Sequence, residues 1–295
     1  MDLSRLALVL VLGVALAPTS RAAACASCGC GDPTLTTIGV GQPFAGRARV
    51  SLALEGRWDE LGEGTVMGEA SARLAASYAF DDRVALAASV PLLLRDLTWA
   101  SQRHVTTLGL GDADVRARVV LLRDRSFAPS HLFGVALGVK LPTSIDQVDA
   151  HGARLPVVAQ SGSGTIDPLI GLTYSHFADP FALFASATVA LPFAGRYEES
   201  PGPSLFLSVA AQHRFDGHFS VRLGTDARLD APALIGARTD PRTRHFSLFT
   251  AADLLVSPIT DWIFQLGASV PVLQDSPQGR TEGVYFRLAV TADIS

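Results

Sequence analysis

The chain has 295 residues, a formal net charge of −4 and 48% hydrophobic residues. Its lysines and arginines are scattered rather than clustered, which excludes an electrostatic nucleic-acid-binding surface. After residue 20 no apolar run reaches the ~20 residues that a membrane-spanning helix needs. The apolar residues are therefore distributed along the chain, and a helical membrane bundle is excluded.

The first 24 residues have the pattern of a secretory signal peptide. Arg5 supplies a positive charge, and the apolar stretch from Leu6 to Ala17 is too short to span a bilayer. The alanines that follow provide the small side chains that a signal peptidase requires. We expect residues 1–24 to be removed during export, with cleavage between Ala22 and Cys25.

The next segment, residues 25–45, contains the only three cysteines, and we expect it to lie in the periplasm. The spacing of Cys25, Cys28 and Cys30 permits a disulfide in an oxidising compartment. The same thiolates are suitable ligands for a soft metal such as Cu(I) or zinc. Cys25 is also placed for attachment of a lipid anchor, although Ala22 stands where that processing usually needs a branched residue. The three interpretations stay open.

From Gly46 onward, runs of about ten residues alternate between apolar and polar side chains. Successive side chains of a strand point to opposite sides, so each run predicts a strand with one apolar and one polar face. The first run sets Ala48, Val50, Leu52 and Leu54 against Arg47, Arg49, Ser51, Glu55 and Arg57. A second run lies in residues 69–80, and others begin near Val84, Asp112, Leu132, Ile166, Phe181, Leu205, Phe219, Phe246, Trp262 and Val284.

The connections between these runs alternate in length. Short turns lie near residues 81–83, 123–130, 178–180, 216–217 and 257–260, whereas long polar loops are expected at 96–109, 143–164, 195–202, 230–243 and 274–282. Outer-membrane barrels have short periplasmic turns and long external loops. Aromatic residues at the short turns predict a girdle at the lipid interface. They are Phe80, Phe133, Phe177, Phe181, Phe215, Phe219 and Trp262.

A soluble β-sandwich also alternates, but its buried face needs large interlocking side chains. Here many apolar-face positions are alanine, and the polar faces carry arginine and aspartate in mid-strand. The pattern favours an all-β, transmembrane, antiparallel up-and-down barrel of about 12 strands over residues 46–295, following a cleaved signal peptide. We expect it in the outer membrane of a Gram-negative bacterium, in contact with lipid.

Two motifs, Gly109-Leu-Gly-Asp-Ala-Asp-Val-Arg-Ala-Arg118 and Gly138-Val-Lys-Leu-Pro-Thr143, resemble the outer-membrane family named for the putative MetA pathway of phenol degradation. The likeness extends loosely over residues 46–295. The chain departs from the family at Ser144, where glycine is usual, and at Ser295, where barrels usually end in an aromatic residue. The resemblance implies an exported transporter with a pore; it does not imply a phenol substrate.

The polar faces carry many charges, and we expect them to line the lumen. A surplus of arginine would bias the lumen toward anionic or polar solutes, because a narrow pore focuses the field of its charges. Alternatively, most of them pair across strands and stiffen the barrel. We expect pairing for most, with a narrow pore along the remaining arginines. The candidate pore-lining residues are Arg47, Arg49, Arg73, Asp112, Asp114, Arg116, Arg118, Lys140, Arg214, Arg222, Asp226, Arg228 and Arg287.

The functional expectation is a channel for small solutes, with no cofactor and no chemical step. The sequence has no Gly-x-Ser-x-Gly elbow, phosphate-binding glycine loop or His-Glu-x-x-His motif. One alternative is a non-conducting structural or adhesion barrel whose long loop at residues 143–164 reaches a partner. Another is an outer-membrane lipid hydrolase, for which His176 and His213 are the candidates to inspect.

Overall fold

The structure is a computed structural model that describes residues 45–62, 64–125, 129–193, 195–197, 199–215, 218–236, 238–259 and 261–294. The predicted signal peptide lies outside the described residues. So does the cysteine segment apart from Ala45, including Cys25, Cys28 and Cys30. The signal peptide and the three interpretations of the cysteines therefore stay predictions.

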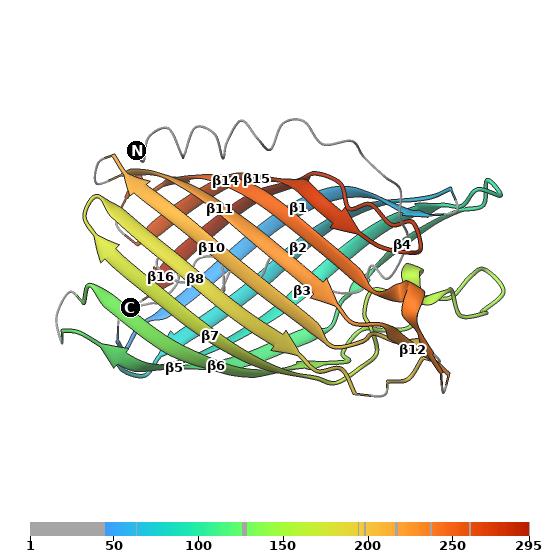
Figure 1. Ribbon diagram of the computed structural model, residues 1–295, viewed down its shortest axis with the longest axis horizontal. Helices are drawn as coiled ribbons and strands as arrows, with labels where there is room; N and C mark the ends of the chain where they lie inside the picture. The colour runs from blue at the N-terminus through green and yellow to red at the C-terminus, as the bar shows by residue number, and fades with distance from the viewer. Residues whose placement is uncertain are drawn as a thin grey trace.

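The described chain forms one closed antiparallel barrel (Figure 1). Each strand pairs with its sequence neighbour in the barrel, and the last strand returns to the first, from Ala48 opposite Ile294 to Arg57 opposite Tyr285. The barrel strands are β1 (Ala48–Gly62), β2 (Thr65–Ala79), β3 (Val84–Thr98), β4 (His104–Leu110), β5 (Ala113–Arg123), β6 (His131–Leu141), β7 (Asp167–Ala178), β8 (Phe181–Ala190), β10 (Ser204–Arg214), β11 (Phe219–Asp230), β14 (His245–Val256), β15 (Trp262–Asp275) and β16 (Tyr285–Ile294).

Strands β4 and β5 both pair with β3 and occupy one position in the barrel. The 13 strands of the sheet therefore give 13 − 1 = 12 positions, which confirms the predicted twelve-strand barrel. Five short elements lie in the loops at one end: η1 (Val157–Ala159), β9 (Glu199–Ser200), β12 (Ala233–Ile235), β13 (Arg238–Asp240) and η2 (Pro241–Thr243). Among the described residues, no helix is both long and apolar enough to cross a lipid bilayer.

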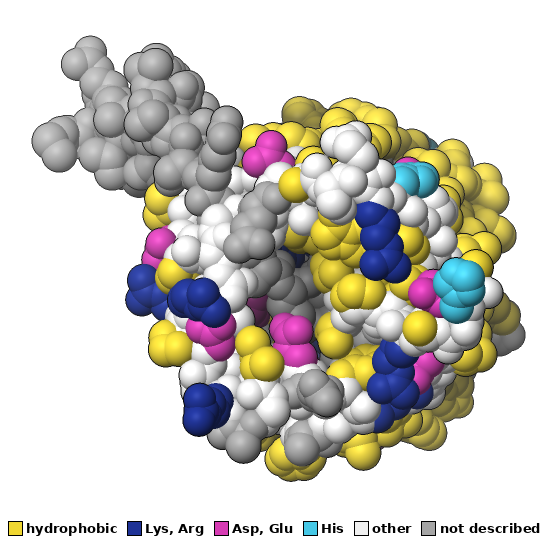
Figure 2. Space-filling model, turned by 90° about the vertical axis from the view of Figure 1, so that its right-hand side faces the viewer, with side chains coloured by type: hydrophobic (Ala, Val, Ile, Leu, Met, Phe, Trp, Pro, Cys, Tyr) yellow, Lys and Arg dark blue, Asp and Glu magenta, His cyan; other side chains and the backbone are white. Residues whose placement is uncertain are grey.

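The alternation predicted from the sequence is present on the two faces of the wall. The apolar face points outward and forms a hydrophobic flank, visible along the upper, right-hand and lower rim in Figure 2. Exposure of so large an apolar surface to water would be unfavourable, so this flank is suited to contact with lipid. Its exposed residues include Leu52, Leu54, Leu74, Leu86, Leu94, Leu137, Ile170, Leu172, Leu223, Leu266, Phe286 and Leu288.

The two ends of the barrel differ. The short turns gather at the left-hand end in Figure 1, and η1, β12 and the longer loops lie at the right-hand end, called here the outer end. The predicted loop at residues 96–109 is wrong in extent, because β3 and β4 continue as a paired hairpin and leave only residues 99–103 between the two strands. The β1–β2 turn is also tight although it lies at the outer end.

The aromatic girdle is largely as predicted. Phe80, Phe181, Phe215 and Trp262 are exposed on the outer face at the short-turn end. Phe177 is the exception: it shares its face of β7 with inward residues and packs edge-on against the buried Phe184, with ring centroids 6.0 Å apart. Its position in β7 fixes this orientation, because a one-residue difference in phase moves a side chain to the other face.

Candidate functional site: the barrel interior

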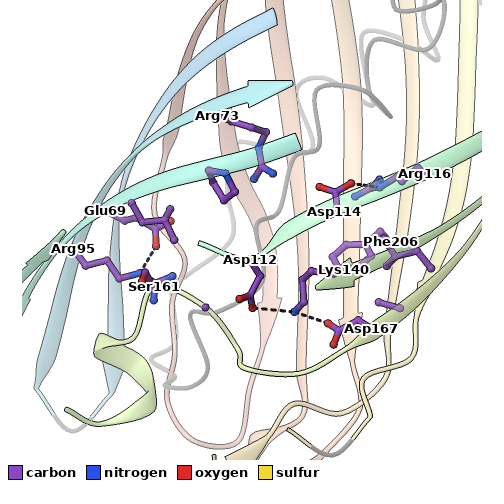
Figure 3. Close-up of a pocket in the computed structure, with 15 residues that line it drawn as sticks. Glu69, Arg73, Arg95, Asp112, Asp114, Arg116, Lys140, Ser161, Asp167 and Phe206 are labelled. Carbon is purple, nitrogen blue, oxygen red and sulfur yellow. Dashed lines mark hydrogen bonds and ion pairs between the residues drawn. The ribbon is translucent and has the colours of Figure 1, made fainter. Parts of the chain in front are cut away.

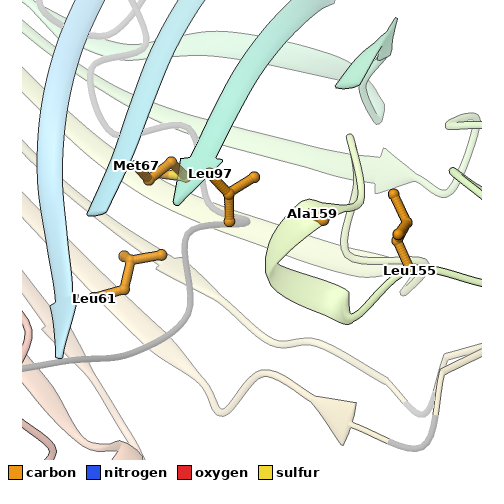
Figure 4. Close-up of a cluster of buried hydrophobic side chains, with 5 residues drawn as sticks. All are labelled: Leu61, Met67, Leu97, Leu155 and Ala159. Atoms are coloured by element: carbon orange, nitrogen blue, oxygen red, sulfur yellow. The ribbon is translucent and has the colours of Figure 1, made fainter. Parts of the chain in front are cut away.

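A long loop folds into the outer mouth of the barrel. This inner loop (residues 142–166) carries η1 and follows β6 directly. Leu155 and Ala159 belong to a buried apolar cluster with Leu61, Met67 and Leu97 from the outer ends of β1, β2 and β3 (Figure 4). The outer ends of these three strands therefore form the apolar surface on which the inner loop packs.

Hydrogen bonds from the wall fix the same loop. The guanidinium of Arg95 donates to the carbonyl of Gln160 and, at 3.5 Å, to that of Val158. Thr107 donates from its hydroxyl to the carbonyl of Ala159 at 3.2 Å. Gln160 is fully buried and its amide donates to the carbonyls of Gln147 and Leu155. These bonds satisfy backbone groups that a buried loop would otherwise leave without partners.

A bulge between β4 and β5 makes room for the loop and changes which residues face inward. Leu92 and Ser89 of β3 are three residues apart, whereas their partners Leu110 and Asp114 are four apart. One extra residue shifts the inward face from odd to even positions, which directs both Asp112 and Asp114 into the barrel. A Cβ on Gly111 would lie 3.0 Å from the carbonyl oxygen of Ser161, so the loop can approach only because this residue is glycine.

Lys140 belongs to the second of the two motifs and contacts both Asp112 of the first motif and the last residues of the inner loop. Its ammonium lies 2.5 Å from the Asp167 carboxylate and 3.9 Å from that of Asp112. It also donates to the Ser163 hydroxyl at 2.5 Å. The backbone amide of Ser163 donates to Asp112 at 2.7 Å. The motif residues Asp112 and Lys140 therefore anchor the inner loop.

A cavity of about 110 Å³ remains beneath the inner loop (Figure 3). One part of its lining is charged and is mostly neutralised by ion pairs, including Arg95 with Glu69 at 2.6 Å and Arg116 with Asp114 at 2.7 Å. Ser161 and Gly162 of the inner loop also line the cavity, and the remaining lining is apolar and comes from β3, β7, β8 and β10. The apolar residues are Pro91, Leu93, Leu169, Ala190 and Phe206.

Most of the other predicted inward charges are also paired. Their N–O distances are Arg49–Asp293 2.5 Å, Arg222–Asp253 2.9 Å, Arg228–Asp230 2.7 Å and Arg287–Glu55 2.9 Å. Asp226 accepts a hydrogen bond from Ser208. At the short-turn end, Arg47 pairs with Asp261 at 2.7 Å, and Arg214 pairs with Asp179 in the turn after β7. The expectation that most of these charges pair is therefore met.

Two predicted arginines differ from the others. Within the described part of the chain, neither Arg73 nor Arg118 has a carboxylate within 4.0 Å. Among the described residues, the side-chain partner of Arg73 is the Ser89 hydroxyl, 3.4 Å from Nη1. Arg95 and Ser161 are interior residues that the sequence analysis missed. Arg95 continues the odd-numbered inward face of β3, a signal that was available, whereas nothing in the sequence of the loop predicts the position of Ser161.

A second charged cluster lies where the β15–β16 loop meets the wall. Glu282 of this loop is buried and lies against Arg280, against Arg228 at 3.6 Å and against His245 at 3.4 Å. Burial raises the pKa of the Glu282 carboxyl, but the nearby Arg280, His245 and Arg228 together lower it well below its ordinary value. The charged form of Glu282 therefore helps to hold this loop on the barrel.

The histidines considered for a hydrolase lie on the outer face of the wall. His213 packs between Phe181 and Phe215, with ring centroids 4.7 and 4.6 Å away. His176 stacks on His131, and its Nδ1 lies 3.1 Å from the backbone carbonyl of Ser130. In the described residues, neither ring has a serine hydroxyl as a hydrogen-bond partner. Both positions are typical of anchors at a lipid interface.

A closed barrel with an apolar outer flank and a charged interior defines the outer-membrane β-barrel class. The fold is similar to the solved COG4313 outer membrane channel from Pseudomonas putida F1, at 12% identity and a TM-score of 0.70, covering 85% of this chain and 96% of that one. It is also similar to the β domain of the Bordetella autotransporter BrkA, at 9% identity and a TM-score of 0.52, covering 83% of this chain and 99% of that one. No protein-family model and no curated protein matches the sequence.

Proposed function

We propose that this chain is an outer-membrane channel through which small solutes pass down their gradients. The observation that carries the proposal is the cavity beneath the inner loop, enclosed by a barrel whose charges face inward and whose apolar side chains face outward. The shared fold with a solved outer-membrane channel supports it. The two motifs described above further support a place in the MetA-pathway outer-membrane family, because Asp112, Asp114, Arg116 and Lys140 from these motifs line the cavity.

The buried part of the inner loop favours a channel. Residues 150–154 of the loop are exposed at the outer end, but Gln160, Ser163 and Thr165 are fully buried, so this second part of the loop is not presented to an outside partner. A loop folded inward narrows the passage instead, and pore diameter together with the lining groups sets which solutes cross. We therefore infer that only small solutes pass, and that the candidate pore-lining residues act mainly by filling and shaping the lumen.

Liposome swelling tests the proposal. Liposomes that contain the purified full-length protein are expected to swell in an isotonic pentose such as arabinose, and to swell much more slowly in a tetrasaccharide such as stachyose. Liposomes with heat-unfolded protein serve as the control. If folded protein swells no faster in arabinose than protein-free liposomes do, the channel proposal is wrong.

A further inference from the structure

We propose that the cavity beneath the inner loop is a binding site for a small carboxylate with a short apolar body, and that Arg73 is its anchor. The proposal rests on the proposed channel function and names the class of solute that the passage selects. Arg73, Ser161 and Phe206 all line the cavity (Figure 3), and they come from β2, the inner loop and β10. Each contributes a different part of the recognition.

Arg73 and Ser161 supply hydrogen-bond donors that the described part of the chain leaves unused. Arg73 is 8% exposed and Ser161 is 4% exposed. In the described part of the chain, Arg73 Nε and Ser161 Oγ have no hydrogen-bond partner. A guanidinium has only donors and stays charged, and a buried donor without a partner is costly. An anionic oxygen would satisfy Arg73 and form a charge-assisted hydrogen bond.

The remaining cations of the cavity are already occupied. Arg95 pairs with Glu69, Arg116 with Asp114, and Lys140 with Asp167. A ligand carboxylate that bound any of these would compete with a carboxylate held by the fold. Among the described residues, the side-chain partner of Arg73 is the Ser89 hydroxyl at 3.4 Å, so Arg73 is the cation that is available to a ligand. The described part of the charged lining thus offers one anion position.

The apolar wall defines the rest of the ligand. Leu93, Leu169 and Phe206 line the same cavity as Arg73, so a ligand held there by its carboxylate also meets hydrocarbon. The cavity measures about 110 Å³. A dry engineered cavity of about 150 Å³ accommodates benzene, so this site suits a body of only a few carbons. A short-chain carboxylate such as butyrate combines both features.

Calorimetric titration of the purified full-length protein in detergent micelles tests the site. We expect butyrate to bind, and acetate, 1-butanol and butylamine each to bind at least about tenfold more weakly, since each lacks the apolar body or the anionic group. Arg73→Gln should weaken butyrate binding by about tenfold or more, the scale of one charge-assisted hydrogen bond. Arg73→Lys, which keeps the charge, should retain part of the affinity.

Arg118→Gln is the matched control, because Arg118 also lacks a carboxylate partner among the described residues but does not line the cavity. Its affinity for butyrate should stay at the wild-type level. The proposal is overturned if wild-type protein does not bind butyrate, if butylamine binds equally well, or if Arg73→Gln and Arg118→Gln have equal effects. Folding of each variant is checked by circular dichroism. Binding in micelles does not depend on conduction, so a solute-tight barrel would reject the channel proposal while this titration still reports on the site.

Discussion

Lys140 and Asp167 face each other across the β6–β7 ladder, with 2.5 Å between the ammonium and the carboxylate. One residue lies just before the inner loop and the other just after it. Their ion pair therefore closes the base of the loop, while the hydrogen bonds from Arg95 and Thr107 hold the loop at Gln160 and Ala159. Fixing the loop at these two places restricts the conformations of a 25-residue segment (166 − 141 = 25) that would otherwise be a free surface loop.

Replacing Lys140 with methionine should destabilise the barrel by about 3–5 kcal/mol, because it leaves buried carboxylates without their cation. Asp112 and Asp167 are both buried, and both have Lys140 as their ion-pair partner. The double variant Lys140→Met with Asp167→Asn should recover a substantial part of the loss. Urea unfolding followed by tryptophan fluorescence measures both. Equal stability of Lys140→Met and wild type would contradict the anchoring role.

Arg95→Gln should release the inner loop near Gln160 and increase the unit conductance. The change removes the bonds to the carbonyls of Gln160 and Val158, while Arg57 still neutralises Glu69 at 3.0 Å. Single-channel recording measures the effect. Arg123→Gln is the control, because Arg123 forms its ion pair with Asp82 at the short-turn end, away from the mouth. A conductance unchanged by Arg95→Gln would show that the loop does not limit the passage.

Gly111→Val should displace the inner loop, because a Cβ at this position would lie 2.8 Å from Pro91 and 3.0 Å from the Ser161 carbonyl oxygen. Overpacking of this kind costs about 1–3 kcal/mol. The expected readouts are reduced stability in urea and faster proteolysis within residues 142–166. Gly56→Val is the matched control, since nothing lies within 4 Å of a Cβ there. Equal behaviour of the two variants would refute the close approach.

Acid should release the β15–β16 loop. The folded pKa of Glu282 is lowered below its ordinary value of 4.5, so its charge stabilises the folded loop above that pH. This contribution is lost as the pH falls through the folded pKa. The protection of the amides of residues 276–284 against hydrogen exchange, relative to their intrinsic rates at each pH, should therefore be high at neutral pH and fall in acid below pH 4.5. Glu282→Gln should already exchange faster at neutral pH and lose the acid step; an acid step that persists in Glu282→Gln would assign it to another group.

The strands and their two faces were predictable because lipid and lumen impose a period of two on each strand. Arg49 and Leu52, for example, have opposite environments that the alternation predicts. Asp112 was correctly predicted to face inward because a new alternating run, after the break between β4 and β5, was taken to begin at that residue. Arg95 was missed because the polar residues after it favoured a loop, although Asp96 and Thr106 pair in the β3–β4 ladder.

The inward fold of the loop was not predictable from its composition. Residues such as Gln160, Ser161 and Ser163 are as suitable for an exposed loop as for a buried one. Their burial depends on Arg95 and Thr107, which are more than 50 residues away in the sequence. Only the three-dimensional arrangement of the strands brings these groups together, so the cavity and its lining become visible only in the structure.

Planar-bilayer recording of the purified full-length protein distinguishes a channel from a solute-tight barrel. We expect discrete conductance steps in wild-type protein and larger steps in Arg95→Gln, whose inner loop is released. Folded protein that inserts into the bilayer but produces no steps, with or without the Arg95 substitution, would contradict the channel.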